Sequence, residues 1–149
     1  MLNWDRSVMM PSGSGMARAE QTSGLEVIAH ETLAAPDMGD LLEAASAAPL
    51  DQWQSANLRE MRRRWVHAAA LEPRLVEARA KACAQSEMVW REARAKSDFR
   101  LLLPFMQTVL DLTREAGQAK AAALNCPVYD ALLNEYEPGG KSARLDAIF

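Results

Sequence analysis

His30 opens the only segment of the sequence that approaches a catalytic motif. Residues 30–34 read His-Glu-Thr-Leu-Ala, which matches the zinc-binding helix motif HExxH at every position but the last. That motif places two imidazoles, one helical turn apart, on the same zinc ion, and the glutamate between them activates the bound water. Ala34 supplies no ligand, and the other of the 2 histidines, His67, lies in a different predicted helix. We therefore expect both histidines to be structural, since a zinc site would require His30, His67 and a carboxylate to meet through folding.

The 2 cysteines, Cys83 and Cys126, lie far apart and form no CxxC spacing, so the sequence offers no thiol motif for metal or redox chemistry. We expect reduced thiols, with Cys83 packed on the inward, alanine-rich face of its helix. A serine nucleophile is equally unsupported, because there is no GxSxG motif. The Ser-Gly-Ser-Gly stretch at 12–15 lacks the preceding strand and following lysine of a phosphate-binding loop, and we interpret it as a hinge or loop.

The remaining charged and aromatic side chains of note fit structural roles. Four clustered arginines share their helix with acidic and apolar residues, a pattern typical of a solvated helix face. These are Arg59, Arg62, Arg63 and Arg64. Trp53, Trp65 and Trp90 fall on apolar helix stripes and are expected to anchor a core or an interface. Asp5 lies in a loop-like segment, where we expect it to cap a helix start or to pair with Arg18.

The length and the charge of the chain limit the classes of protein to which it can belong. The chain has 149 residues, with 17 basic and 20 acidic side chains and a net charge of −3. This length suffices for one hydrophobic core, and we expect residues 1–149 to form a single helical domain. The interleaved charges lack the basic footprint of a nucleic-acid-binding protein, and no apolar stretch is long enough to cross a bilayer. We therefore expect a soluble, cytoplasmic protein without nucleic-acid or membrane partners.

The pattern of residues predicts an all-α fold. Alanine is abundant, and proline and glycine cluster at a few positions, which favours helices joined by short connections and no sheet. We expect an antiparallel helical bundle of about six to seven helices. They span residues 16–33, 37–47, 51–70, 73–96, 98–123, 128–136 and 142–149. The short link after residue 70 predicts an antiparallel hairpin of helices 51–70 and 73–96, and Pro104 is expected to kink the next helix.

Four segments, which we call the resemblance segments, differ from generic helical sequence. The first contains Leu2, the Trp-Asp pair at 4–5, Met-Met-Pro at 9–11, the loop at 12–15 and Arg18. The second reads Asn-Leu-Arg-Glu at 57–60, and the third spans residues 90–99 with Pro104. The fourth reads Tyr-Asp-Ala-Leu-Leu at 129–133 and continues into Tyr-Glu-Pro-Gly at 136–139. In order and spacing these segments resemble the N-terminal part of the carboxypeptidase Taq family of metallocarboxypeptidases.

The resemblance implies a helical, cytosolic and usually dimeric type of enzyme, which removes C-terminal residues from peptides. Its divalent metal, zinc or cobalt, is held by an HExxH helix and a downstream glutamate, and these ligands follow the region matched here. This chain contains neither HExxH nor the family's His-Pro-Phe and Asp-x-Arg-x-Thr motifs. The resemblance therefore implies no catalytic residue, no cofactor-binding residue and no metal ligand in this chain. Compared with family members the chain looks clipped at both ends.

Two hypotheses of different classes follow. The first is a noncatalytic helical module that corresponds to the wall or lid of the substrate groove. It predicts exposed apolar helix faces and self-association, or association with the missing catalytic region. The alternative is an independent interaction or regulatory protein that reuses the fold and pairs with a full-length enzyme. Residual metal-dependent peptidase activity would require histidine ligands from another chain.

Overall fold

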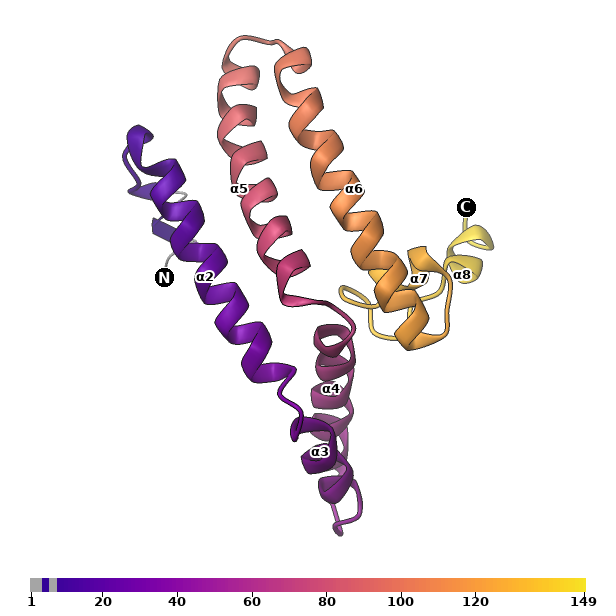
Figure 1. Cartoon of the computed structure of the whole chain (residues 1–149). Helices are drawn as coiled ribbons and strands as arrows, with labels where there is room; N and C mark the ends of the chain where they lie inside the picture. The colour runs from indigo at the N-terminus through magenta and orange to yellow at the C-terminus, as the bar shows by residue number, and fades with distance from the viewer. Residues whose placement is uncertain (1–3, 6–7) are drawn as a thin grey trace. The chain divides into compact units, whose positions relative to one another are not determined.

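The computed structural model describes residues 4–5 and 8–149 of the chain. Within these residues there is no strand, and seven α-helices have both ends described, which confirms the all-α fold class (Figure 1). They are preceded by a short 3-10 helix, η1. The elements are η1 (Ser12–Ser14), α2 (Gly15–Leu33), α3 (Met38–Ser46), α4 (Gln52–Ala69), α5 (Pro73–Ala95), α6 (Phe99–Leu124), α7 (Val128–Leu133) and α8 (Ser142–Asp146). None of the helices in the described residues is long and apolar enough to cross a membrane.

A capping box in the sequence explains where α4 begins. The Asp51 carboxylate accepts a hydrogen bond from the Gln54 amide at 2.8 Å, and the Gln54 side chain accepts one from the Asp51 amide at 3.0 Å. This reciprocal capping box satisfies two amides at the start of α4 that have no partner inside the helix. Helix α6 continues through Pro104. Its neighbours α7 and α8 are shorter than predicted, since they end at Leu133 and Asp146.

The chain divides into two compact units, each built from two separate stretches of sequence. Unit 1 consists of residues 1–29 and 73–114, and unit 2 consists of residues 30–72 and 115–149. The predicted hairpin of α4 and α5 would join helices that belong to different units, so it stays a prediction. The same holds for the single domain over residues 1–149.

In unit 1, α2, α5 and the first part of α6 lie side by side (Figure 1). Small side chains let the helices approach, because a Cβ atom added to Gly15 would lie 2.6 Å from Cε of Met88. The Lys81 ammonium group of α5 pairs with Glu20 of α2 at 3.2 Å and with Glu77 of its own helix at 2.8 Å. Among the described residues of this unit, the buried ones are Gly15, Ala19, Ser23, Leu75, Ala82, Ala84, Ala93 and Leu102.

In unit 2, close backbone contacts again use glycine. A Cβ atom on Gly39 of α3 would lie 3.0 Å from the ring of Trp65 in α4, and one on Gly117 of α6 would lie 2.9 Å from the Val128 side chain of α7. Glycine at these positions brings α3 onto α4 and α7 onto the end of α6. The buried residues of this unit are His30, Leu42, His67, Ala116, Gly117, Lys120 and Ala131.

Candidate functional site

The two histidines occupy buried positions on different helices. His30 of α2 and His67 of α4 are 9% and 8% exposed. Nε2 of His67 lies 2.8 Å from Oδ1 of Asn134 and shares a hydrogen bond with it. Nowhere in residues 4–5 and 8–149 do three or more histidine, cysteine or acidic side chains come together in a group that could hold a metal ion. The described residues therefore form no set of ligands for the zinc or cobalt ion that the resemblance implies for a whole enzyme.

Asn134, just past the end of α7, is held by two side chains of α4. Besides the contact with His67, the Arg63 guanidinium donates a hydrogen bond to the Asn134 carbonyl oxygen at 2.8 Å. Arg63 is itself oriented by Glu60, whose carboxylate accepts from Nε at 2.9 Å. A cation at a helix C-terminus also interacts favourably with the helix dipole. We call Arg63, His67 and Asn134 the Asn134 clamp, and it gives His67 a structural role.

An ion pair holds Glu135, the residue that follows Asn134. The Lys120 ammonium group of α6 pairs with the Glu135 carboxylate. Lys120 is only 4% exposed, and a buried ammonium group is costly unless a carboxylate compensates for its lost hydration. The end of α7 is thus fixed by α4 through Asn134 and by α6 through Glu135.

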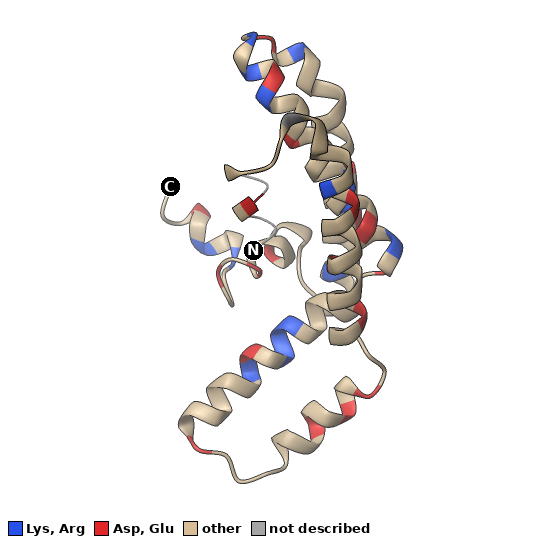
Figure 2. Cartoon of the chain, turned by 90° about the vertical axis from the view of Figure 1, so that its left-hand side faces the viewer, with Lys and Arg blue, Asp and Glu red and all other residues tan. Residues whose placement is uncertain are grey.

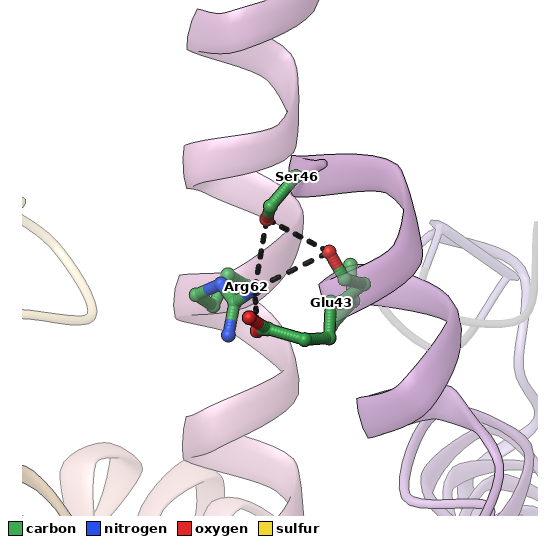
Figure 3. A network of polar contacts seen from close by, with 4 residues as sticks. Glu43, Ser46 and Arg62 are labelled. Atoms are coloured by element: carbon green, nitrogen blue, oxygen red, sulfur yellow. Dashed lines mark hydrogen bonds and ion pairs between the residues drawn. The ribbon is translucent and has the colours of Figure 1, made fainter. Parts of the chain in front are cut away.

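The arginine cluster on α4 is only partly the solvated face that the sequence predicts. Arg59 and Arg64 are exposed, but Arg62 and Arg63 are partly buried and join α4 to other elements. Figure 3 shows Arg62 between Glu43 and Ser46 of α3, donating hydrogen bonds at 3.0 Å and 2.9 Å. Periodicity could not reveal this role, because the partners that join Arg62 and Arg63 to other elements lie 16 to 71 residues away.

Two expectations about buried side chains need correction. Cys83 is exposed, although we placed it on the inward face of its helix. The residues on either side of it, Ala82 and Ala84, are buried instead. In so alanine-rich a helix the apolar stripe is too weak to fix which face points inward. Trp53, expected to anchor a core or an interface, is 85% exposed, which excludes the core role within this chain and leaves the interface role a prediction. Trp65 packs against Gly39.

The first resemblance segment forms the ion pair that the sequence predicts. The Asp5 carboxylate pairs with the Arg18 guanidinium of α2. Its backbone carbonyl accepts hydrogen bonds from the amides of Met9 at 2.9 Å and Met10 at 2.8 Å. Leu2 of the same segment lies outside the described residues. Asp5 therefore ties the start of the chain to α2.

The third and fourth resemblance segments contain helix boundaries. Ser97 ends α5 with φ of 53°, and Asp98 starts α6 by accepting a hydrogen bond from the Arg100 amide at 3.0 Å. Asp130 of α7 accepts one from the Ser142 amide at 2.9 Å and so caps the start of α8. Hydrogen bonds from the Ser142 side chain and amide lower the pKa of Asp130. Ser97, Asp98 and Asp130 of these segments thus shape helix ends.

The aromatic residues of the first, third and fourth resemblance segments are largely exposed. Trp4, Trp90 and Phe99 in unit 1 are 63%, 43% and 58% exposed. Tyr129 and Tyr136 in unit 2 are 61% and 86% exposed. Exposed aromatic side chains on this scale mark surfaces that contact another part of a protein or a partner. These five residues are the best candidates for functional contacts. The sequence identified the segments that contain them, but only the structure shows that their side chains are exposed.

Comparison with known proteins gives a consistent assignment. The family model described as carboxypeptidase Taq (M32) metallopeptidase matches residues 1–149. Thermostable carboxypeptidase 1 of Thermus thermophilus is 33% identical, with 98% of this chain and 31% of that protein covered. Thermostable carboxypeptidase 1 of Pyrococcus furiosus is 28% identical, with 100% of this chain and 30% of that protein covered.

Solved structures agree. The structure of Trypanosoma cruzi metallocarboxypeptidase 1 superimposes with a TM-score of 0.79 and 36% identity, over 99% of this chain and 30% of that one. The P. furiosus carboxypeptidase structure gives a TM-score of 0.76 and 27% identity, over 97% of this chain and 29% of that one. The chain thus spans less than a third of the length of these relatives. It belongs to the carboxypeptidase Taq (M32) metallopeptidase family and corresponds to the N-terminal part of its members.

Proposed function

We propose that this chain is a noncatalytic helical module, which forms the N-terminal wall or lid over the substrate groove of a metal-dependent carboxypeptidase. The parent activity is the removal of C-terminal residues from peptides. The observation that carries the proposal is the exposure of the aromatic residues within the resemblance segments. A module whose family-like residues are exposed in both units is expected to pack them against the catalytic part of the enzyme.

The side chains with chemical potential support the same proposal. His67 is engaged by Asn134, Asp5 by Arg18, and Asp130 by Ser142. These contacts support a structural role for each group. We propose that the chain holds no cofactor itself, and that the zinc or cobalt ion and its ligands belong to the catalytic part.

The exposed apolar surface also bears on assembly. On α6, Leu101, Leu103 and Leu110 are 38%, 51% and 43% exposed. Burial of such side chains contributes roughly 25 cal/mol per Å² of apolar surface removed from water. We therefore propose that the isolated chain self-associates in the cytoplasm unless the catalytic part, or a dimeric full-length enzyme, covers these faces.

A chimaera tests the function. The matched N-terminal part of the T. thermophilus relative is replaced by residues 1–149, and release of C-terminal residues is measured with added Zn²⁺ or Co²⁺. Peptides with a free C-terminus are compared with amidated copies, and this chain alone is assayed in parallel. We expect activity from the chimaera on free C-termini and none from the chain alone. Metal-dependent hydrolysis by the chain alone would overturn the noncatalytic assignment, and an inactive but folded chimaera would overturn the wall or lid role.

A further inference from the structure

A groove lies at the closed end of the α5–α6 hairpin in unit 1. It has a volume of about 430 Å³, and we call it the hairpin groove. Its lining contains the apolar residues Trp90, Ala93, Phe99, Leu102 and Met106, together with Arg94 and the turn residues Ser97 and Asp98. The groove follows from the sharp turn between the helices, where Ser97 adopts a left-handed conformation and Asp98 caps α6.

The hairpin groove has a buried floor and exposed apolar walls. Ala93 and Leu102 are 4% and 5% exposed, whereas Trp90, Phe99 and Met106 are 43%, 58% and 37% exposed. The small side chain of Ala93 leaves the space between the larger walls open. Such a shape fits one large apolar side chain, which would cover the floor and bury part of each wall.

One cation lies at the side of this apolar space. The Arg94 guanidinium stacks over the Trp90 ring, 5.3 Å from its centroid. In the part of the chain that the structure describes, no carboxylate forms an ion pair with Arg94, whereas Arg91 pairs with Glu87 at 2.7 Å. Stacking on an aromatic ring orients the planar guanidinium without using its hydrogen-bond donors. Arg94 is thus positioned to receive a carboxylate.

The surroundings of Arg94 carry excess positive charge. Residues 87–100 contain four basic side chains, Arg91, Arg94, Lys96 and Arg100, and three acidic ones, Glu87, Glu92 and Asp98. Arg91 pairs with Glu87 and Lys96 with Glu92, so the local excess is one positive charge. The basic side chains gather at the turn between α5 and α6, at the top of Figure 2. Asp98 uses one carboxylate oxygen to cap α6, so its charge is directed at the helix start. A positive site on a chain of net charge −3 favours an acidic partner.

We propose that the hairpin groove docks the catalytic part of a carboxypeptidase Taq enzyme through an acidic side chain that neighbours a large apolar one. The carboxylate pairs with Arg94, and the apolar side chain fills the space above Ala93 and Leu102. This inference rests on the proposed function. Two observations favour the catalytic part as the occupant of the groove. The groove residues belong to a resemblance segment, and about 69% of the T. thermophilus relative lies outside the 31% that this chain matches.

The test uses the chain as it stands. Overlapping fluorescein-labelled peptides that cover the unmatched part of the T. thermophilus relative are titrated with residues 1–149, and fluorescence anisotropy is measured. We expect binding by a peptide with Asp or Glu beside a large apolar residue. Arg94→Glu should weaken this binding at least about tenfold, which is about 1.4 kcal/mol. Replacing the peptide's acidic residue by lysine should restore binding to Arg94→Glu.

Arg100→Glu is the matched control, because it makes the same charge change on the same hairpin outside the groove lining. It should weaken peptide affinity much less than Arg94→Glu, because it changes only the charge around the groove and removes no direct partner of the carboxylate. Circular dichroism should show equal helix content in all variants. The proposal is overturned if no peptide binds, or if both variants lose affinity equally. It is also overturned if Arg94→Glu instead abolishes self-association or binding to anionic lipid vesicles, since the occupant would then be a second copy or a membrane. An active chimaera with no peptide binding would retain the proposed function and remove only this docking site.

Discussion

Replacing Glu135 by leucine is expected to destabilise unit 2 more than replacing Lys120 by methionine, although both changes break the same ion pair. The reason is unequal burial, since the Lys120 side chain is 5% exposed and that of Glu135 is 30% exposed. Glu135→Leu leaves a buried ammonium group without a carboxylate, which costs about 3–5 kcal/mol. Lys120→Met leaves a carboxylate that water still reaches, so we expect about 1–3 kcal/mol.

The double variant completes the argument. Lys120→Met combined with Glu135→Leu leaves no charge behind and replaces the pair with apolar contacts, so its stability should lie within about 1 kcal/mol of the parent chain. Urea unfolding gives these values through tryptophan fluorescence in a Trp4→Phe, Trp90→Phe background. The remaining tryptophans, Trp53 and Trp65, both lie in unit 2. An equal cost of the two single changes would refute the reasoning from burial, as would a double variant that is less stable than either.

Three further outcomes are expected. Asp51→Ala removes the capping box at α4 and should lower the free energy of unfolding by about 1 kcal/mol. Urea unfolding measures this change, and Asp51→Asn is the control because asparagine keeps the cap. The pKa of Asp130 is lowered by Ser142, so its contribution to stability is complete above the unfolded-state pKa and is lost as the pH falls through the lowered folded-state value. The NMR shift of the Ser142 amide should follow that acid transition, and Asp130→Asn should abolish it. Sedimentation equilibrium should show concentration-dependent self-association that Leu103→Glu reduces, whereas a parent chain that stays monomeric at high concentration would contradict the exposed-face argument.

Features that depend on neighbouring residues could be predicted from the sequence. The all-α class and most helix boundaries follow from proline, glycine and capping residues, as at Asp51 and Asp98. The pairing of Asp5 with Arg18 was also accessible, because only a short segment separates them. Helix ends after residue 133 were harder, since α7 and α8 are too short for an apolar stripe to define them.

Features that depend on distant partners could not be predicted. Arg62 and Arg63 looked like solvent-facing charges because their partners on α3 and next to α7 are far away in sequence. Cys83 was placed on the wrong face because alanine gives a helix little amphipathic contrast. For the candidate site, the motif residues were found from the sequence. Only the folded structure shows that the polar residues are held in hydrogen bonds and ion pairs while the aromatic residues are exposed.

The Asn134 clamp also has a consequence for the order of folding. It joins residues 71 positions apart, and the intervening sequence includes residues 73–114 of unit 1. Closing so long a loop costs only about 0.6 kcal/mol more than closing one of half the length, so its effect on equilibrium stability is small. Its effect on kinetics is larger, because contacts distant in sequence slow folding. During synthesis the residues of α4 therefore leave the ribosome long before Asn134 does. Until Asn134 emerges, Arg63 and His67 lack their hydrogen-bond partner.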